Sequence, residues 1–340
     1  MNGRDTLAFS TINQLRTRSF QCFQSQKLDK INQALYVNRK DVEDFDHVLD
    51  NAITESRLQI PQNDDGDIPI QILYESENVI AINKPPIIQH HNDNVTMGVL
   101  TYIRHLQNSD SEQRFPYQGR IYGVHRLDRE TSGILLLAKT RQVAISMTKA
   151  FRENSVTKFY LALSSKKVKK KKQGWVKGDM VRARRGAWKL QKSMKDPAIS
   201  RFFTAGLGAL TPNNTSSVLR SNDTKEDGID VVPKTLMLFQ PHTGKTHQLR
   251  VAAKSMGLPI LGDPYYKDGD SGFTERTYLH AAAFHVKLDE EDLAVWCPPP
   301  SNFNRFWEYD NAKQSTEFDQ IVLDLLAKNC QCESILRLIQ

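Results

Sequence analysis

A short apolar run limits what this chain can fold into. Gly133 is followed by five apolar residues in succession, residues 134–138, with no polar residue between them. A run that does not alternate is typical of a strand that is buried on both faces. Residues 73–82, 157–163 and 234–240 have β-forming composition and also predict strands, the first of which should end at the prolines after Lys84.

Apolar residues at helical spacing separate these segments. Thr96 is expected to cap a helix over residues 99–106, and Thr140 a helix that buries residues 143–151. A third helix should follow residues 243–246 and end before Gly257, and an amphipathic stretch over 318–326 predicts a packed C-terminal helix. Because strands and helices follow no regular βαβ rhythm, the sequence predicts an α+β fold.

The positive charge is concentrated in one segment. The chain has a net charge of +7, yet residues 166–192 alone hold nine Lys and three Arg against Asp179 as the one acid. This segment also contains Trp175 and Trp188. A basic stretch with interleaved aromatic residues is suited to RNA, whereas a solvated lysine-rich loop with two packed tryptophans is the alternative.

The composition divides the chain into three parts. Residues 1–66 form an N-terminal extension whose first 28 residues have four basic residues and one acid, which fits an organellar transit peptide or a capping extension. A main domain is expected over 67–312, with the basic segment at 164–192 and an exposed insertion at 207–230. Residues 313–340 form a helical end.

No apolar run approaches the roughly 20 residues that a membrane-spanning helix needs, so we expect a soluble, intracellular protein, cytoplasmic or organellar. The four cysteines include one Cys-x-Cys pair, Cys330 and Cys332, without a matching second pair. This spacing is a poor zinc signature, and we predict reduced thiols and no metal site.

A charged loop precedes the apolar run. Residues 125–133 read His-Arg-Leu-Asp-Arg-Glu-Thr-Ser-Gly, and Asp128 stands between Arg126 and Arg129. A carboxylate between two arginines should remain ionised, and in a partly desolvated place it can serve as a nucleophile. From the residues alone, a structural Asp-Arg ion pair with Thr131 and Ser132 as turn residues is the favoured interpretation, since such pairs are commoner than active sites.

Residues 125–133 resemble the H-R-L-D-x-x-T-S-G signature of RluA-type RNA pseudouridine synthases. Three further stretches resemble motifs of this family in the same order: residues 74–85, residues 158–162, and residues 243–250 continued by 262–264 and 279–281. The resemblance implies the pseudouridine synthase fold, with a mixed, largely antiparallel central sheet flanked by helices and loops. It covers the chain from about residue 68 to 288, but residues 1–66 show no RNA-binding domain of the S4 type.

The resemblance also implies roles for individual residues. Asp128 is expected to be the nucleophile, attacking C6 of uracil or C1′ of the ribose, and Arg250 its partner. Tyr160 should stack on the uracil and assist loss of the C5 proton, with Leu249 on the other face of the base. Arg126 should enter the space left by the flipped nucleotide.

Five more residues in the matched stretches are expected to contact substrate or RNA: Lys84, His125, Arg129, Thr131 and His247. A histidine is common in the family two residues after the arginine, where this chain has Ala252. The isomerisation involves no redox change or external energy source, so no cofactor is expected. We expect ribosomal or transfer RNA as the partner and a monomer without an obligate protein partner.

Two other functions remain open. An RNA-binding or assembly factor could keep the fold without turnover, although Asp128, Tyr160 and Arg250 are all present. A hydrolase could be built on His125, Asp128 and His247, although no serine or cysteine nucleophile motif accompanies them.

Overall fold

The structure, a computed structural model, describes residues 58–63, 66–93, 95–108, 115–169, 171–208, 233–266, 276–288, 291–300, 303 and 312–340. The chain divides into two compact units: residues 1–68 with 91–108, and residues 69–90 with 109–340. The transit peptide or cap predicted near the N-terminus lies outside the described residues and stays a prediction.

The smaller unit contains a two-stranded antiparallel ribbon, β1 (Gln62–Asn63) with β2 (Gly66–Asp67), and helix α3 (Val99–Gln107). The predicted helix is confirmed, but the predicted cap is wrong. Gly98 occupies the N-cap position and makes no side-chain cap, while its N–H donates to Asn92 Oδ1 at 2.7 Å. Tyr102 donates its hydroxyl to the Ile68 carbonyl at 2.7 Å, which fixes the buried side of the helix.

The larger unit is built on one sheet. Its strands lie in the order β3-β4-β6-β12-β7-β11-β10-β8-β9, with β5 also paired to β6 and β13 to β12. In chain order the strands are β3 (Gln71–Glu75), β4 (Val79–Lys84), β5 (Tyr122–Gly123), β6 (Ser132–Ala138), β7 (Thr157–Ser164), β8 (Gln173–Arg182), β9 (Trp188–Gln191), β10 (Pro197–Gly206), β11 (Thr235–Pro241), β12 (Leu279–Lys287) and β13 (Asp292–Trp296). Among these described strands, the β6–β12 pair is parallel and the other pairs are antiparallel. The predicted α+β fold with a mixed, largely antiparallel sheet is confirmed.

Strand β6 is buried along its whole length, as the apolar run predicted. It lies between β4 and β12 and also pairs with β5. The single strand predicted over residues 73–82 is wrong, because this segment forms the hairpin β3–β4. Ser76 closes its turn: the Ser76 Oγ accepts from the N–H groups of Asn78 and Val79 at 3.2 and 3.1 Å.

The helices of this unit confirm the sequence pattern. They are α4 (Arg141–Arg152), the short turn η1 (Arg184–Gly186), α5 (Gln248–Ser255), α7 (Ala312–Asn329) and α8 (Glu333–Leu338). Thr140 caps α4 by accepting from the Val143 N–H at 3.2 Å. Gly257 follows α5 with a φ of 75°, a conformation that favours glycine. Helix α7 buries Phe318, Val322 and Leu326 in the core formed with β7, β10 and β11.

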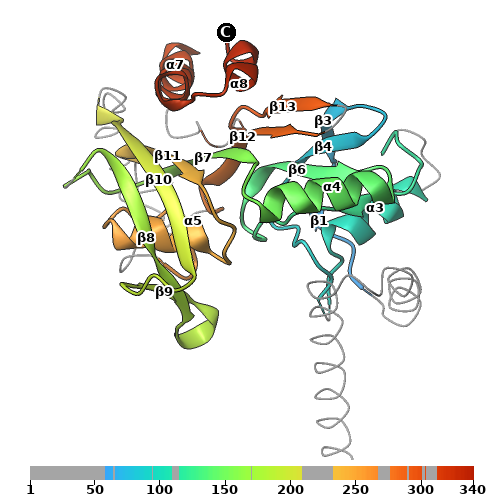
Figure 1. The fold of residues 1–340 in the computed structure, drawn as a ribbon, viewed down its shortest axis with the longest axis horizontal. Coiled ribbons are helices and arrows are strands. Elements are labelled where there is room, and N and C mark those ends of the chain that lie inside the picture. The colour runs from blue at the N-terminus through green and yellow to red at the C-terminus, as the bar shows by residue number, and fades with distance from the viewer. Residues whose placement is uncertain are drawn as a thin grey trace, which may run out of the picture. The chain divides into compact units, whose positions relative to one another are not determined.

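The basic segment does not form a loop, because most of it is the long antiparallel hairpin β8–β9 (Figure 1). The predicted insertion at 207–230 is only partly testable. Leu207 is a buried core residue, which contradicts an exposed start at that position, and residues 209–232 lie outside the described chain. Of the helices that the structure describes, none is long and apolar enough to cross a bilayer.

Gly133→Ala should destabilise the protein. Gly133 has a φ of 102°, and a Cβ there would overlap the Ala281 carbonyl oxygen of β12. Strain of this kind costs about 1–3 kcal/mol or more. Gly206→Ala is the matched control, since a Cβ at Gly206 would meet no atom within 4 Å. Urea unfolding should show a lower midpoint for Gly133→Ala alone, and equal midpoints would contradict the proposed close approach of β6 and β12.

Candidate active site

Asp128 lies in the tight turn that leads into β6. Its carbonyl oxygen accepts from the Thr131 N–H at 3.0 Å, which closes the turn. The Asp128 side chain is 16% exposed, so the carboxylate is partly desolvated yet accessible from outside. The turn therefore places the Asp128 carboxylate directly before β6, which is buried along its whole length.

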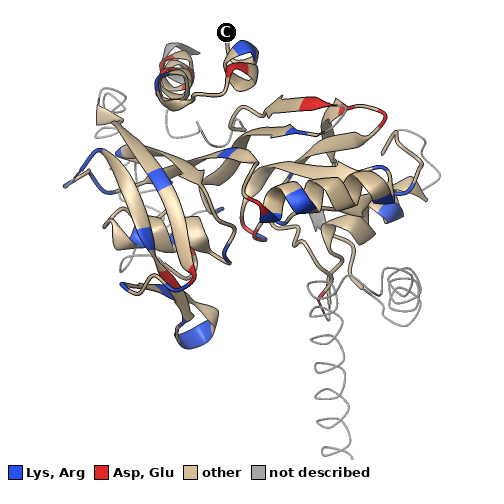
Figure 2. Cartoon of the chain, viewed as in Figure 1, with Lys and Arg blue, Asp and Glu red and all other residues tan. Residues whose placement is uncertain are grey.

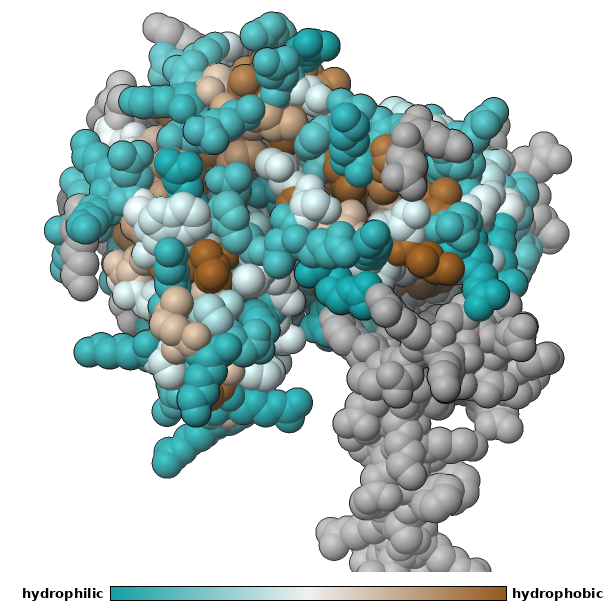
Figure 3. Space-filling view, viewed as in Figure 1, coloured by the Kyte–Doolittle hydropathy of each residue, from teal (hydrophilic) through white to brown (hydrophobic). Residues whose placement is uncertain are grey.

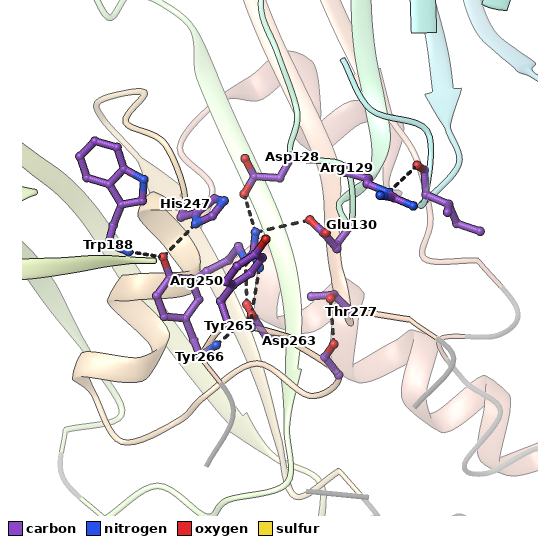
Figure 4. A network of polar contacts seen from close by, with 12 residues as sticks. Asp128, Arg129, Glu130, Trp188, His247, Arg250, Asp263, Tyr265, Tyr266 and Thr277 are labelled. Carbon is purple, nitrogen blue, oxygen red and sulfur yellow. Dashed lines mark hydrogen bonds and ion pairs between the residues drawn. The ribbon is translucent and has the colours of Figure 1, made fainter. Parts of the chain in front are cut away.

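The partner of Asp128 is Arg250 on α5 (Figure 4). Arg250 Nη1 donates to Asp128 Oδ2 at 3.3 Å and to Glu130 Oε2 at 3.5 Å. The same guanidinium is bound on its other edge by Asp263, from Nε to Oδ2 at 2.7 Å and from Nη2 to Oδ1 at 2.9 Å. A bidentate pair fixes the plane of a guanidinium, so Asp263 sets the direction in which Arg250 faces Asp128.

This cluster is deeply buried. The Arg250 side chain is 1% exposed and the Asp263 side chain is fully buried. Burial alone would lower the pKa of Arg250, but the hydrogen bonds and charge of Asp263 outweigh it and raise that pKa. Asp263 also accepts from the backbone N–H groups of Tyr265 and Tyr266 at 2.8 and 3.1 Å. The Arg250 charge is therefore permanent and anchored.

Tyr160 and Leu249 lie beside this ion pair in the fold. Tyr160 is a buried residue of β7, and Leu249 precedes Arg250 on α5. Burial raises the pKa of the Tyr160 hydroxyl, and the negative charge of Asp128 raises it further. The tyrosine is thus close enough to Asp128 to feel its charge, and it stays protonated.

A second chain of hydrogen bonds joins His247 to the β8–β9 hairpin. The Tyr266 hydroxyl accepts from the Trp188 backbone N–H at 2.8 Å and lies 2.8 Å from His247 Nδ1 (Figure 4). His247 stands at the N-terminus of α5 with a φ of 57°. Burial lowers the pKa of His247, partly offset by the charge of Asp128. His247 is therefore a neutral link between the hairpin and the helix that carries Arg250.

Lys84 binds the backbone of the turn that contains Asp128. It is fully buried, and its Nζ donates to the carbonyls of Pro85 and Ile88 at 2.8 Å and of Arg129 at 3.3 Å. Burial lowers the pKa of Lys84 to about 7, although the charge of Asp128 opposes the shift. Ile87 and Arg129 add a reciprocal pair, with the Ile87 N–H donating to the Arg129 carbonyl at 2.9 Å and Arg129 Nε to the Ile87 carbonyl at 3.1 Å.

A buried polar chain fixes the other end of the turn. Arg276 donates to Ser132 Oγ at 2.5 Å, and that hydroxyl lies 2.9 Å from His280 Nδ1. His280 Nε2 lies 3.1 Å from the Cys297 carbonyl, so it carries the proton and Nδ1 accepts from Ser132. Burial lowers the pKa of His280 to about 3, which keeps it neutral.

His125 is placed in an aromatic cluster. Its ring stacks on Phe151 with centroids 4.6 Å apart and lies 5.1 Å from Phe284. His125 Nε2 accepts from the Leu136 N–H at 2.9 Å, and burial lowers the pKa of the ring to about 3. His125 is therefore neutral, and its hydrogen bond joins the turn to the backbone of β6.

Comparison with known proteins gives a family for this arrangement. A family model described as RNA pseudouridylate synthase matches residues 78–255, more than half of the chain. A Haemophilus influenzae protein described as an uncharacterized RNA pseudouridine synthase is 36% identical over 252 residues, which are 74% of this chain and 94% of that protein. The chain belongs to the RNA pseudouridylate synthase family.

Other members of the pseudouridylate synthase family are also similar. The ribosomal large subunit pseudouridine synthase C of Escherichia coli K12 is 32% identical over 222 residues, 62% of this chain and 60% of that protein. Human RNA pseudouridylate synthase domain containing 1 is similar in fold, with a TM-score of 0.54 over 74% of this chain and 94% of that one, at 22% identity. These matches confirm the resemblance seen in the motifs.

The structure gives contacts or burial for several of the predicted residues. Asp128 and Arg250 form an ion pair, and the charge of Asp128 contributes to the raised pKa of the Tyr160 hydroxyl. Arg129 pairs with the Ile87 backbone, and Thr131 is buried, so both shape the turn. The RNA contacts expected of Lys84, His125, Arg126, Arg129, Thr131 and His247 stay predictions.

Sequence reasoning gave no role to Asp263, Glu130 or Tyr266. Asp263 lies within the matched residues 262–264, so the motif contained it, but no sequence pattern showed that it would bind Arg250 thirteen residues earlier. Within the described part of the chain, no three His, Cys, Asp or Glu side chains are grouped so that they could hold a metal ion.

Arg250→Ala should destabilise the protein by about 3–5 kcal/mol, because it leaves the buried Asp263 carboxylate without its cation. Lys245→Ala is the control. Its partner Asp196 is 84% exposed, and removing such a pair should change stability by less than about 1 kcal/mol. Denaturant unfolding of both variants measures the difference, and similar losses would mean that the Arg250 cluster contributes no more than a surface pair.

His280 should make stability depend on acidity. Its folded pKa of about 3 lies below the usual 6.5, so the unfolded chain binds the proton more readily between these values. The unfolding free energy should therefore fall as the pH is lowered from about 6.5 toward 3. In His280→Asn this slope should be shallower by up to about 1.4 kcal/mol per pH unit. Unfolding curves across this pH range test the difference, and an unchanged slope in His280→Asn would refute it.

Proposed function

We propose that this protein converts specific uridines of ribosomal RNA to pseudouridine, with Asp128 as the nucleophile and no cofactor, acting as a monomer. The observation that carries the proposal is the partly exposed Asp128 carboxylate, held by a buried guanidinium that is itself fixed by Asp263. The names of the similar ribosomal large subunit synthases favour ribosomal RNA over transfer RNA.

In the proposed reaction Asp128 attacks C6 of uracil or C1′ of the ribose, and the N1–C1′ bond breaks. The base then turns in the pocket, C5 bonds to C1′, the bond to Asp128 breaks and restores the carboxylate, the C5 proton is lost and N1 gains a proton. Arg250 supports this chemistry by position, since a fixed cation orients the carboxylate without reorganising during the reaction. The target nucleotide must be flipped out of its helix, and Arg126, which is exposed, is the proposed occupant of the gap.

Tyr160 and Leu249 are the proposed contacts to the base. The raised pKa of Tyr160 keeps its phenol protonated in the free protein. A protonated phenol can stack on the base and donate a hydrogen bond through its hydroxyl. To accept the C5 proton, the Tyr160 hydroxyl must first lose its own proton. Leu249 adds an apolar side chain next to Arg250 on α5.

The two other functions make different demands on the site. A silent RNA-binding factor would not need a charged, accessible carboxylate beside a buried arginine. A hydrolase based on His125 would need a histidine that exchanges protons, but His125 Nε2 is occupied by the Leu136 N–H, and the ring stacks on Phe151 and lies 5.1 Å from Phe284. Tritium release from RNA labelled at C5 of uridine separates the three functions, since only a synthase releases the label without cleaving the strand.

Asp128→Asn should abolish tritium release, lowering the rate by roughly three orders of magnitude or more, because it removes the nucleophile. RNA affinity should change little, since phosphate contacts supply most of the binding. Single-turnover tritium release and filter binding measure the two effects.

Glu130→Gln is the matched control for Asp128→Asn. It removes the other carboxylate of the turn that contacts Arg250, at 3.5 Å, and should retain most of the activity. Substantial turnover by Asp128→Asn, or an equal loss in Glu130→Gln, would contradict the assignment of Asp128 as the nucleophile.

A further inference from the structure

The face of the sheet opposite Tyr160 also carries aromatic and basic side chains. A row of paired residues runs from Tyr160 on β7 across β11 and β10 to Gly174 on β8. Residues in one row point to the same face, and the next residue along each strand points to the other face. Trp175 and Arg201 are such next residues and pair with each other. They therefore face away from the catalytic tyrosine.

Four residues form a cluster on this opposite face, which we call the Trp175 surface: Trp175, Lys177, Arg201 and His242. Trp175 is 49% exposed. Lys177 Nζ lies 4.9 Å and Arg201 Cζ 5.8 Å from the centre of the indole, and the His242 ring lies 5.0 Å away. A half-exposed tryptophan surrounded by cationic groups provides both a stacking surface and charge for a polyanion.

The positive charge of the Trp175 surface is not balanced locally. Among the described residues no acidic side chain forms an ion pair with Lys177 or Arg201. The acid that follows on the same side of β8, Asp179, already accepts from Ser193 Oγ at 2.6 Å and from two backbone N–H groups. Burial lowers the pKa of His242, and the positive charges of Lys158, Arg201 and Lys177 lower it further.

The lysine run leads to the Trp175 surface. The described lysines of this run are exposed: Lys166, Lys167, Lys169, Lys171 and Lys172. The carbonyl of Lys172 accepts from the Thr204 N–H and hydroxyl, both at 2.8 Å, so the end of the run is attached to β10. Lys172 is three residues before Trp175, about 10 Å along an extended chain.

Figure 2 shows basic residues on β8, on β10 and at the end of the β8–β9 hairpin. In the same view, Figure 3 shows hydrophilic side chains mixed with paler and apolar ones over β8 and β10, without a continuous apolar face. Strand β9 is the edge of the sheet, and its hairpin carries the exposed Arg182, Arg184 and Arg185. A polyanion that leaves the Asp128 side of the sheet can pass around this edge and keep basic contacts.

We propose that the Trp175 surface binds a single-stranded segment of the RNA substrate, with one base stacked on the Trp175 indole and its phosphates near Lys177, Arg201 and the lysine run. The proposal rests on the proposed function for the identity of the RNA and adds a second contact on the opposite face from Asp128. Single-stranded RNA fits better than duplex RNA, because only an unstacked base can lie against an exposed indole. An acidic peptide would use the charges but not the stacking.

The test measures binding of a fluorescein-labelled oligouridine to the full-length protein by anisotropy over a range of salt concentrations. Trp175→Ala should weaken binding about tenfold, and Trp175→Phe should recover most of it, since stacking needs an aromatic face. The double variant Lys177→Gln with Arg201→Gln should reduce the slope of log affinity against log salt by about 1.4 units, the value for two phosphate contacts to a single strand. Lys328→Gln with Arg337→Gln, on α7 and α8, removes the same charge and should leave the slope unchanged.

A second readout reports stacking itself. An oligouridine that carries one 2-aminopurine should lose fluorescence on binding to the unaltered protein and to Trp175→Phe, and much less on binding to Trp175→Ala. Equal affinity and equal quenching in Trp175→Ala would overturn the proposal, as would equal competition by a polyglutamate of matched charge. None of these measurements needs turnover, so a failure of the isomerisation assay for the proposed function would leave the binding result interpretable.

Discussion

The position of the Asp128 carboxylate depends on one buried cation, Arg250. Arg250 stands on α5, Asp263 on the segment after it, and Asp128 far earlier in the chain, so a single guanidinium joins three parts of the sequence. An arginine enclosed in this way is tolerated only because Asp263 forms two hydrogen bonds with it. The consequence for chemistry is that Asp128 meets a cation whose position was already decided by the fold.

The sequence predicted those strands and helices that are determined by the spacing of nearby residues. Strand β6 and helices α4, α5 and α7 followed from apolar spacing, and Thr140 caps α4 as its residue type indicated. The ion pair of Asp128 with Arg250 followed only from the family resemblance, since nothing in the spacing relates residues so far apart. Arg129, which flanks Asp128 in the sequence, donates to the Ile87 carbonyl, a contact that the sequence did not indicate.

Three features were not predicted because each depends on an individual contact that residue composition does not reveal. The turn between β3 and β4 depends on Ser76 accepting from two N–H groups, a local bond that an unbroken β-rich composition conceals. Gly98 rather than Thr96 precedes α3, and its N–H is bound by Asn92 Oδ1, six residues earlier, which the capping pattern did not show. The sequence did not distinguish the two tryptophans of the basic segment. In the structure the Trp175 side chain is half exposed on β8. The backbone N–H of Trp188, on β9, donates to the Tyr266 hydroxyl.

The place of β12 in the sheet has a consequence for synthesis. This strand, Leu279–Lys287, is made long after β6 and β7, yet it lies between them and pairs with both. While the ribosome is still completing the last quarter of the chain, the facing edges of β6 and β7 have no strand to join them. Unpaired edges bind other strands readily, and long-range pairing is slow. A nascent chain of this protein should therefore need protection from aggregation until β12 emerges, and a truncation before that strand should yield no partly active fragment.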